Sequence, residues 1–144
     1  MNEFKLLVYG VPVPQGSMRA FNIPGGKFPV VTSDNKKTKP WKQEIAGAAD
    51  DAMQKAKLTV FAGVPVRVSV DFYFDRPKSL KKAIVAKVTK PDLDKLIRAV
   101  LDALTGTVFK DDAQVARISV SKAFDQRPRA EISVYVYEHH EWDY

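Results

Sequence analysis

Four aspartates surround one predicted helix, and their type and spacing suit metal-ion chemistry. Asp92 and Asp94 stand two residues apart at the start of the helix, and the neighbours Asp111 and Asp112 follow its end. Carboxylate oxygens are the hard ligands that Mg²⁺ and Mn²⁺ prefer, and water or phosphate oxygens complete the coordination. Because the whole chain carries a formal net charge of +6, this local concentration of acid predicts a divalent-cation site in a basic protein.

Each pair of aspartates also has an ordinary structural interpretation. A helix N-terminus favours negative charge, so Asp92 and Asp94 could simply be capping acids worth about 0.3–1 kcal/mol. Asp111 and Asp112 could simply form a turn, where Asp is common. The connection after the helix, from Thr105 on, is about seven residues, and at roughly 3.3 Å per residue it can span a helix of ~20 Å. The sequence therefore permits Asp112 to return beside Asp92 and Asp94 without requiring it.

The amino-acid composition limits which partners the protein can bind and which reactions it can catalyse. With 23 Lys and Arg against 17 Asp and Glu, the chain attracts polyanions such as nucleic acid. It contains no cysteine, which excludes disulfides, a thiolate nucleophile and Cys-ligated zinc. No phosphate-binding glycine loop or nucleotide motif is present, so we expect no nucleotide cofactor. The start lacks a signal-peptide pattern and no apolar run is long enough for a bilayer, so we expect a cytoplasmic protein without a membrane partner.

Hydrophobic periodicity predicts the elements that position the aspartates. Alternating apolar residues predict strands at residues 4–9, 66–74, 118–124 and 132–137. One helix is predicted from about Thr38 to Ala56, and a second from Pro91 to Gly106. The order strand, helix, strand, helix, strand, strand predicts one α/β (α+β) domain over residues 1–144. We expect two layers, with two main helices on a small mixed sheet that is mainly antiparallel toward the end.

The apolar stripe of each predicted helix fixes where its charged residues face. The first stripe contains Trp41, Ile45, Ala48, Ala52 and Ala56. The second contains Leu93, Leu96, Ile97, Val100, Leu101 and Leu104. With the second stripe buried, Asp92, Asp94, Lys95 and Arg98 must face solvent or the mouth of a cleft, because an unpaired buried carboxylate is prohibitively costly.

Two segments, from Pro12 to about Lys39 and from Arg76 to Lys90, are predicted to be loops rich in cations. The second leads directly into Asp92, so its lysines are expected at the rim of any site there. The candidate DNA-binding residues of the two loops are Arg19, Lys36, Lys37, Lys78, Lys81, Lys82, Lys87 and Lys90.

Three stretches of the sequence resemble the RusA family of Holliday junction endonucleases, many of them phage- or prophage-borne. They are Lys90-Pro91-Asp92-Leu93-Asp94-Lys95-Leu96, Leu101-Asp102-Ala103-Leu104 and Asp111-Asp112-Ala113-Gln114-Val115. Weaker similarity extends over residues 8–14 and 64–74. The resemblance implies a RusA-like fold in a bacterial or phage-encoded homodimer. It also implies Mg²⁺-dependent resolution of four-way DNA junctions by paired symmetric nicks, in recombination and repair.

The resemblance assigns roles to individual residues. It implies that Asp92, Asp94 and Asp112 bind Mg²⁺, for which Mn²⁺ is a candidate substitute, whereas Asp111 is the less certain member of its pair. Two residues depart from the family, which usually has asparagine where this chain has Lys95 and lysine where it has Arg98.

Arg98 has two interpretations. In the mechanism that the resemblance implies, it stabilises charge on the phosphate that is cleaved. In the other, it only forms a helical ion pair with Asp94, worth about 0.2–0.5 kcal/mol. Asp71, on the polar face of its predicted strand, is a secondary candidate for supporting the metal site. Two other functions stay open: a nuclease for flaps or other branched DNA, and a non-catalytic basic DNA-binding module.

Overall fold

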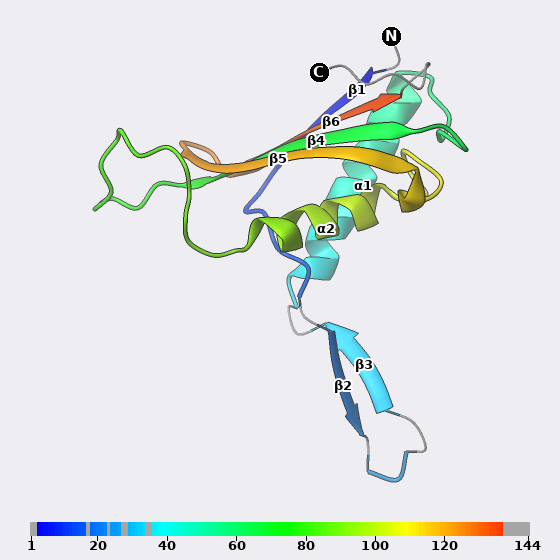
Figure 1. The fold of residues 1–144 in the computed structure, drawn as a ribbon, viewed down its shortest axis with the longest axis horizontal. Coiled ribbons are helices and arrows are strands. Elements are labelled where there is room, and N and C mark those ends of the chain that lie inside the picture. Colours follow the sequence, from blue (N-terminus) through cyan, green and yellow to red (C-terminus); the bar gives the residue numbers. More distant parts are fainter. Residues whose placement is uncertain (1–2, 17, 23, 27–28, 34–35, 137–144) are drawn as a thin grey trace.

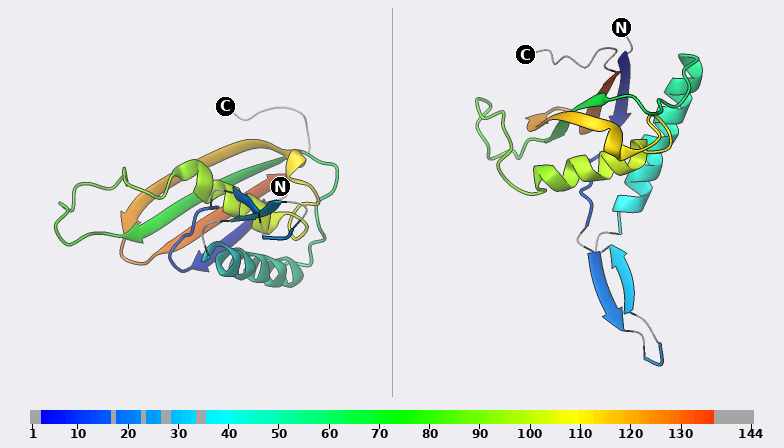
Figure 2. Two further views of the ribbon diagram at one scale, coloured as in Figure 1. Left: turned by 90° about the horizontal axis from the view of Figure 1, so that it is seen from below. Right: turned by 45° about the vertical axis from the view of Figure 1, so that its right-hand side comes forward.

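A computed structural model of the chain describes residues 3–16, 18–22, 24–26, 29–33 and 36–136. A four-stranded sheet has the order β1-β6-β4-β5 (Figure 1). Its strands are β1 (Glu3–Tyr9), β4 (Val66–Asp75), β5 (Val115–Asp125) and β6 (Arg129–Val136). Helices α1 (Thr38–Lys55) and α2 (Leu93–Leu104) lie on the same face of this sheet (Figure 2). The predicted α+β class, with two helices on a small mixed sheet, is therefore confirmed.

The pairing of the strands follows from the connections between them. β6 is antiparallel to both β1 and β4, whereas β4 and β5 are parallel. Parallel neighbours need a long crossover, and α2 provides it between β4 and β5. The pairs that β6 makes confirm the predicted antiparallel end of the sheet, and the parallel pair of β4 with β5 makes the sheet mixed, as predicted. Because of this crossover, α2 runs in the opposite direction to β5 (Figure 1).

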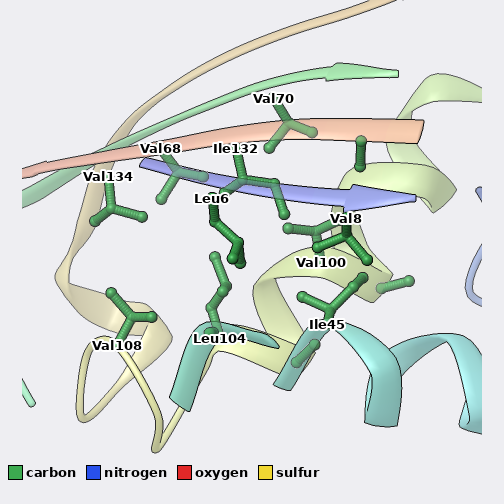
Figure 3. Close-up of a cluster of buried hydrophobic side chains, with 14 of the residues drawn as sticks. Leu6, Val8, Ile45, Val68, Val70, Val100, Leu104, Val108, Ile132 and Val134 are labelled. Atoms are coloured by element: carbon green, nitrogen blue, oxygen red, sulfur yellow. The ribbon is translucent and has the colours of Figure 1, made fainter. Parts of the chain in front are cut away.

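The core lies between the sheet and the two helices, and Figure 3 shows its centre. Every second residue of β4, from Val66 to Phe74, points inward and is buried. On α1 the buried residues include Ala49 and Met53, whereas the predicted Ala56 lies after the helix and is exposed. The predicted stripe was therefore placed partly on the wrong side of α1, because alanines fill both sides of that helix.

On α2 the core buries only part of the predicted apolar stripe. Leu96, Val100 and Leu104 are fully buried, but the predicted core residues Leu93, Ile97 and Leu101 are only partly buried. An ion pair between Lys42 of α1 and Asp102 of α2, with 3.1 Å between the charged atoms, marks the α1 side of the helix. Helical geometry places the partly buried residues on the other side, away from α1 and toward the edge strand β5.

A two-stranded hairpin projects from the body of the protein (Figure 1). It consists of β2 (Met18–Asn22) and β3 (Pro29–Ser33), within the segment predicted to be a loop. The prediction is wrong here because the breakers of the turn conceal strands of only five residues each. At the base of the hairpin, the Thr38 hydroxyl donates a hydrogen bond of 2.8 Å to the Pro14 carbonyl. No helix among the described residues is long and apolar enough to cross a membrane.

Candidate active site

Asp92 and Asp94 lie at the N-terminal end of α2, and both side chains are exposed. Asp92 occupies the capping position, where its carbonyl accepts the Lys95 and Leu96 N–H groups at 3.2 and 3.1 Å. Its side chain makes no capping hydrogen bond. Asp94 lies in the first turn, 3.7 Å from the Lys95 ammonium, and its side chain is 73% exposed. Neither carboxylate is committed to holding the helix, so both are available to a cation.

The backbone leading into Asp92 is fixed by a lysine of β5. The Lys122 ammonium donates hydrogen bonds of 2.8 Å to the carbonyls of both Thr89 and Pro91. Sequence reasoning did not single out Lys122. The available signal was a charged residue at an inward-facing position, between Val120 and Phe124, of a strand that otherwise alternates. Lys122 therefore acts as a positioning residue for the start of α2.

Arg98 lies one turn after Asp94 and is exposed. Its expected helical ion pair with Asp94 does not form, because Asp94 lies beside Lys95 instead. Within the described residues, no ion pair or side-chain hydrogen bond engages the guanidinium of Arg98. The structure thus leaves Arg98, in the N-terminal half of α2, free to meet an anion.

The other two aspartates have different roles at the 3₁₀ turn η1 (Asp112–Gln114). Asp111 caps the turn and Asp112 is its first residue. The Asp111 carboxylate accepts the Ala113 N–H at 2.9 Å, and the Asp111 N–H donates to the Gln114 side chain, also at 2.9 Å. Gln114 in turn donates to two carbonyls of the segment before β4, those of Phe61 and Val64. Asp111 is therefore a capping residue, whereas Asp112 is exposed and has no side-chain partner among the described residues.

The two groups of aspartates do not meet within one chain. After α2 the chain makes a tight turn, in which the Gly106 N–H donates to the Phe109 carbonyl at 2.7 Å and Phe109 is fully buried. The connection therefore stays at the C-terminal end of α2, as Figure 1 shows. A helix of 12 residues, about 18 Å long, lies between Asp92 and the connection that leads to Asp112. The return of Asp112 that the sequence permits does not occur, and the described residues contain no group of three or more metal-ligating side chains.

The family profile described as "Endodeoxyribonuclease RusA" matches residues 10–135, which include both aspartate groups. The chain belongs to the RusA family. "Uncharacterized protein YqaN" of Bacillus subtilis (strain 168) is 36% identical over 144 aligned residues, which cover 93% of this chain and 96% of the relative. "Crossover junction endodeoxyribonuclease rusA" of Lactococcus phage r1t is 32% identical over 72 residues, which cover 49% of this chain and 54% of the relative. The resemblance found in the sequence is thus confirmed at the level of the family.

Most of the predicted DNA-binding lysines of this RusA-family chain are exposed. They are Lys36, Lys37, Lys78, Lys81, Lys82 and Lys90. Arg19 lies on β2, and its side chain is outside the described part of the structure.

Lys87 departs from the prediction because it turns inward. Its ammonium lies 5.2 and 5.3 Å from the ring centres of Phe74 and Phe124 and donates a hydrogen bond of 2.7 Å to the Thr89 hydroxyl. Burial, with a smaller contribution from the charge of Lys122, lowers the pKa of Lys87. Lys87 is therefore no longer a candidate for contacting DNA.

Asp71 cannot support the metal site within its own chain. It alternates along β4 with the buried Val70 and Phe72, so it lies on the sheet face opposite the helices. There its carboxylate accepts a hydrogen bond of 2.6 Å from the Ser121 hydroxyl. The prediction of a secondary metal-site role fails because the strand alternation turns Asp71 away from α2.

Proposed function

We propose that this RusA-family protein resolves Holliday junctions as a Mg²⁺-dependent endonuclease, in recombination and repair. We further propose that it acts as a homodimer, and that each active site takes carboxylates from both copies. The observation that carries this proposal is the separation of Asp92 and Asp94 from Asp112 by the length of α2. Each end offers exposed carboxylate oxygens of the kind that Mg²⁺ prefers, but neither end alone offers three.

The edge of the sheet supports a dimer. β5 is an edge strand, and the loop between β4 and α2 covers only the second half of its outer edge. There the Lys87 N–H donates to the Lys122 carbonyl at 3.2 Å, and the Phe124 N–H donates to the Val85 carbonyl at 2.9 Å. In the described part of the chain, no strand pairs with the outer edge over residues 115–121. An unpaired edge is a ready template for a strand of another chain.

Apolar side chains flank this free edge on the helix side. Ile118 pairs in register with the buried Val68, yet it is 46% exposed. The partly buried stripe of α2 that faces away from α1 lies on the same side of the molecule. A second copy that added its own β5 to this edge would cover both the strand and the stripe.

A two-fold axis near Ile118 would then bring the two groups of aspartates together. Symmetry would make the two β5 strands antiparallel and run the two α2 helices in opposite directions. Asp92 lies near Lys122, at the far end of β5, whereas Asp112 lies just before its start. The pairing therefore brings Asp112 of the partner subunit to the end of α2 that carries Asp92 and Asp94.

In this proposal the chemistry is hydrolysis of a DNA phosphodiester. Asp92, Asp94 and the partner's Asp112 would hold Mg²⁺, which when bound would supply an activated water and neutralise charge on the phosphate. Arg98 donates hydrogen bonds to the phosphate oxygens, where negative charge grows as water attacks phosphorus and the P–O bond breaks. Lys90 and the exposed lysines of residues 76–91 hold the DNA backbone. Two symmetric sites account for paired nicks.

Cleavage of a mobile four-way junction tests the proposal. We expect Mg²⁺ or Mn²⁺ to support paired nicks in opposed strands, EDTA to stop them, and a duplex of the same sequence to stay intact. Faster cleavage of flaps than of four-way junctions would favour the branched-DNA nuclease instead. Binding without cleavage in any metal would favour the non-catalytic module.

A further inference from the structure

The segment between β4 and α2 combines positive charge with exposed apolar side chains. Residues 76–91 contain six Lys and Arg and no acid. Three apolar residues of this segment are exposed, Ile84 at 42%, Val85 at 57% and Val88 at 90%. Val88 is thus presented to solvent almost completely, within a surface that attracts polyanions.

The usual order of burial is reversed around Val88. Its neighbour Lys87 lies inward, with its ammonium over the rings of Phe74 and Phe124, while the apolar Val88 points out. A strand-like segment ordinarily buries the valine and exposes the lysine. Such a conflict between local pattern and structure is typical of a functional position.

The backbone on both sides of Val88 is anchored. The N–H of Lys87 donates to the Lys122 carbonyl at 3.2 Å, and the Lys122 ammonium holds the carbonyls of Thr89 and Pro91. Earlier in the segment, the Arg76 guanidinium donates to two carbonyls, those of Lys81 and Ile84. Val88 is therefore held in place. Four residues of extended chain put its Cα at most about 14 Å from that of Asp92.

We infer that Val88 is a wedge that packs against the bases exposed at the branch point of the DNA. The outside of a duplex presents sugars and charged phosphates, whereas a branch point presents the faces of its last base pairs. Apolar side chains inserted at base steps partly unstack them, and surrounding cations hold the phosphates on either side. The inference rests on the proposed function, because it places the branch point beside Asp92 and Asp94.

The test is a four-way junction with 2-aminopurine, a base whose fluorescence rises on unstacking, at the crossover. In EDTA, wild-type protein should raise the fluorescence, and Val88→Ala should lose most of this rise. We expect Val88→Ala to weaken junction binding about five- to tenfold while duplex binding is unchanged. Val88→Leu should restore both signals. Leu7→Ala removes a comparably small apolar group on the far sheet face, where Leu7 is 44% exposed, and should behave as wild type.

Each other outcome counts against the wedge in a distinguishable way. If wild type cleaves junctions and Val88→Ala gives the same fluorescence and the same preference for junctions over duplex, the wedge is wrong and the proposed function stands. If Val88→Ala instead dissociates the dimer in sedimentation, Val88 is a contact between copies. If wild type binds junction and duplex equally well, both the wedge and the proposed function fail.

Discussion

At its N-terminal end, α2 carries two exposed carboxylates that make no structural hydrogen bond, whereas the turn after its C-terminal end commits one carboxylate and leaves one free. Asp94 lies 3.7 Å from the Lys95 ammonium, and among the described residues Asp92 makes no ion pair. Asp111 instead closes a capping box with Gln114, and its neighbour Asp112 projects without a partner among the described residues. The comparison separates aspartates that shape the fold from aspartates left for a ligand, a distinction that residue type alone does not make.

The comparison also shows that neither end is complete. The N-terminal half of α2 carries two exposed carboxylates and the exposed Arg98, and the turn after the helix carries one exposed carboxylate that makes no hydrogen bond among the described residues. Because α2, a helix about 18 Å long, lies between them, the proposed two-fold dimer would supply the third carboxylate at both ends at once.

The largest expected effect comes from the free carboxylates. Asp92→Asn, Asp94→Asn and Asp112→Asn should each reduce junction cleavage to background, because each removes a metal ligand. Binding to the junction should persist or strengthen, since a negative charge near phosphate is removed. Circular dichroism should stay native, because these side chains are exposed. Cleavage at the wild-type rate by Asp92→Asn would remove that residue from the metal site.

Asp111→Ala is the matched control for Asp112. It should lower the free energy of unfolding by about 1 kcal/mol, the usual cost of losing a side-chain cap, and leave cleavage near wild type well below the melting temperature. Loss of cleavage in Asp111→Ala, with activity kept in Asp112→Asn, would exchange the roles that the capping box assigns.

The next largest effect is expected at Arg98. Arg98→Ala should lower the single-turnover cleavage rate by about 10²-fold, as loss of one preorganised donor to developing charge does elsewhere. Junction affinity and thermal stability should change little, because Arg98 makes no ion pair within the described residues. Arg98→Lys should recover much of the rate, since an ammonium can still meet the phosphate. An unchanged rate in Arg98→Ala would exclude it from the mechanism.

The smallest effect concerns the exposed lysines of the loop before α2. Replacing Lys78, Lys81 and Lys82 by Ala should weaken binding to every DNA structure. For duplex DNA, the slope of log K against log salt should become less steep by about 0.9 for each phosphate that the protein no longer neutralises. Lys5→Ala, on the sheet face opposite the helices, is the control and should leave the slope unchanged. An unchanged slope in the triple variant would mean that this loop faces away from DNA.

Much of the fold could be predicted because its strands alternate clearly. Val66 to Phe74 follows a strict period of two, and the heptad-like spacing of α2 identifies its buried side. The parallel pairing of β4 with β5 was harder to predict, because it depends on where the crossover helix ends. The hairpin of β2 and β3 escaped prediction because its strands are short and the turn between them is rich in breakers.

The candidate site was predictable in its residues but not in its assembly. The length of the connection after α2 limits how far the chain can reach. It does not determine the direction in which the chain runs. The apolar pair Val108 and Phe109 was a signal that this connection is buried in the core rather than stretched along the helix. The free edge of β5 depends on sheet order, which the sequence does not specify by local pattern.

Mixing two inactive variants tests most directly whether the site is shared between copies. Asp92→Asn and Asp112→Asn are unfolded together, refolded and assayed on a four-way junction. In a mixed dimer one site then receives both substitutions and the other receives neither, so the mixture should regain nicking of one strand per junction. Asp92→Asn mixed with Asp94→Asn is the control and should stay inactive, because each site keeps one substitution. If mixed dimers form and the first mixture is as inactive as the control, the shared site is contradicted.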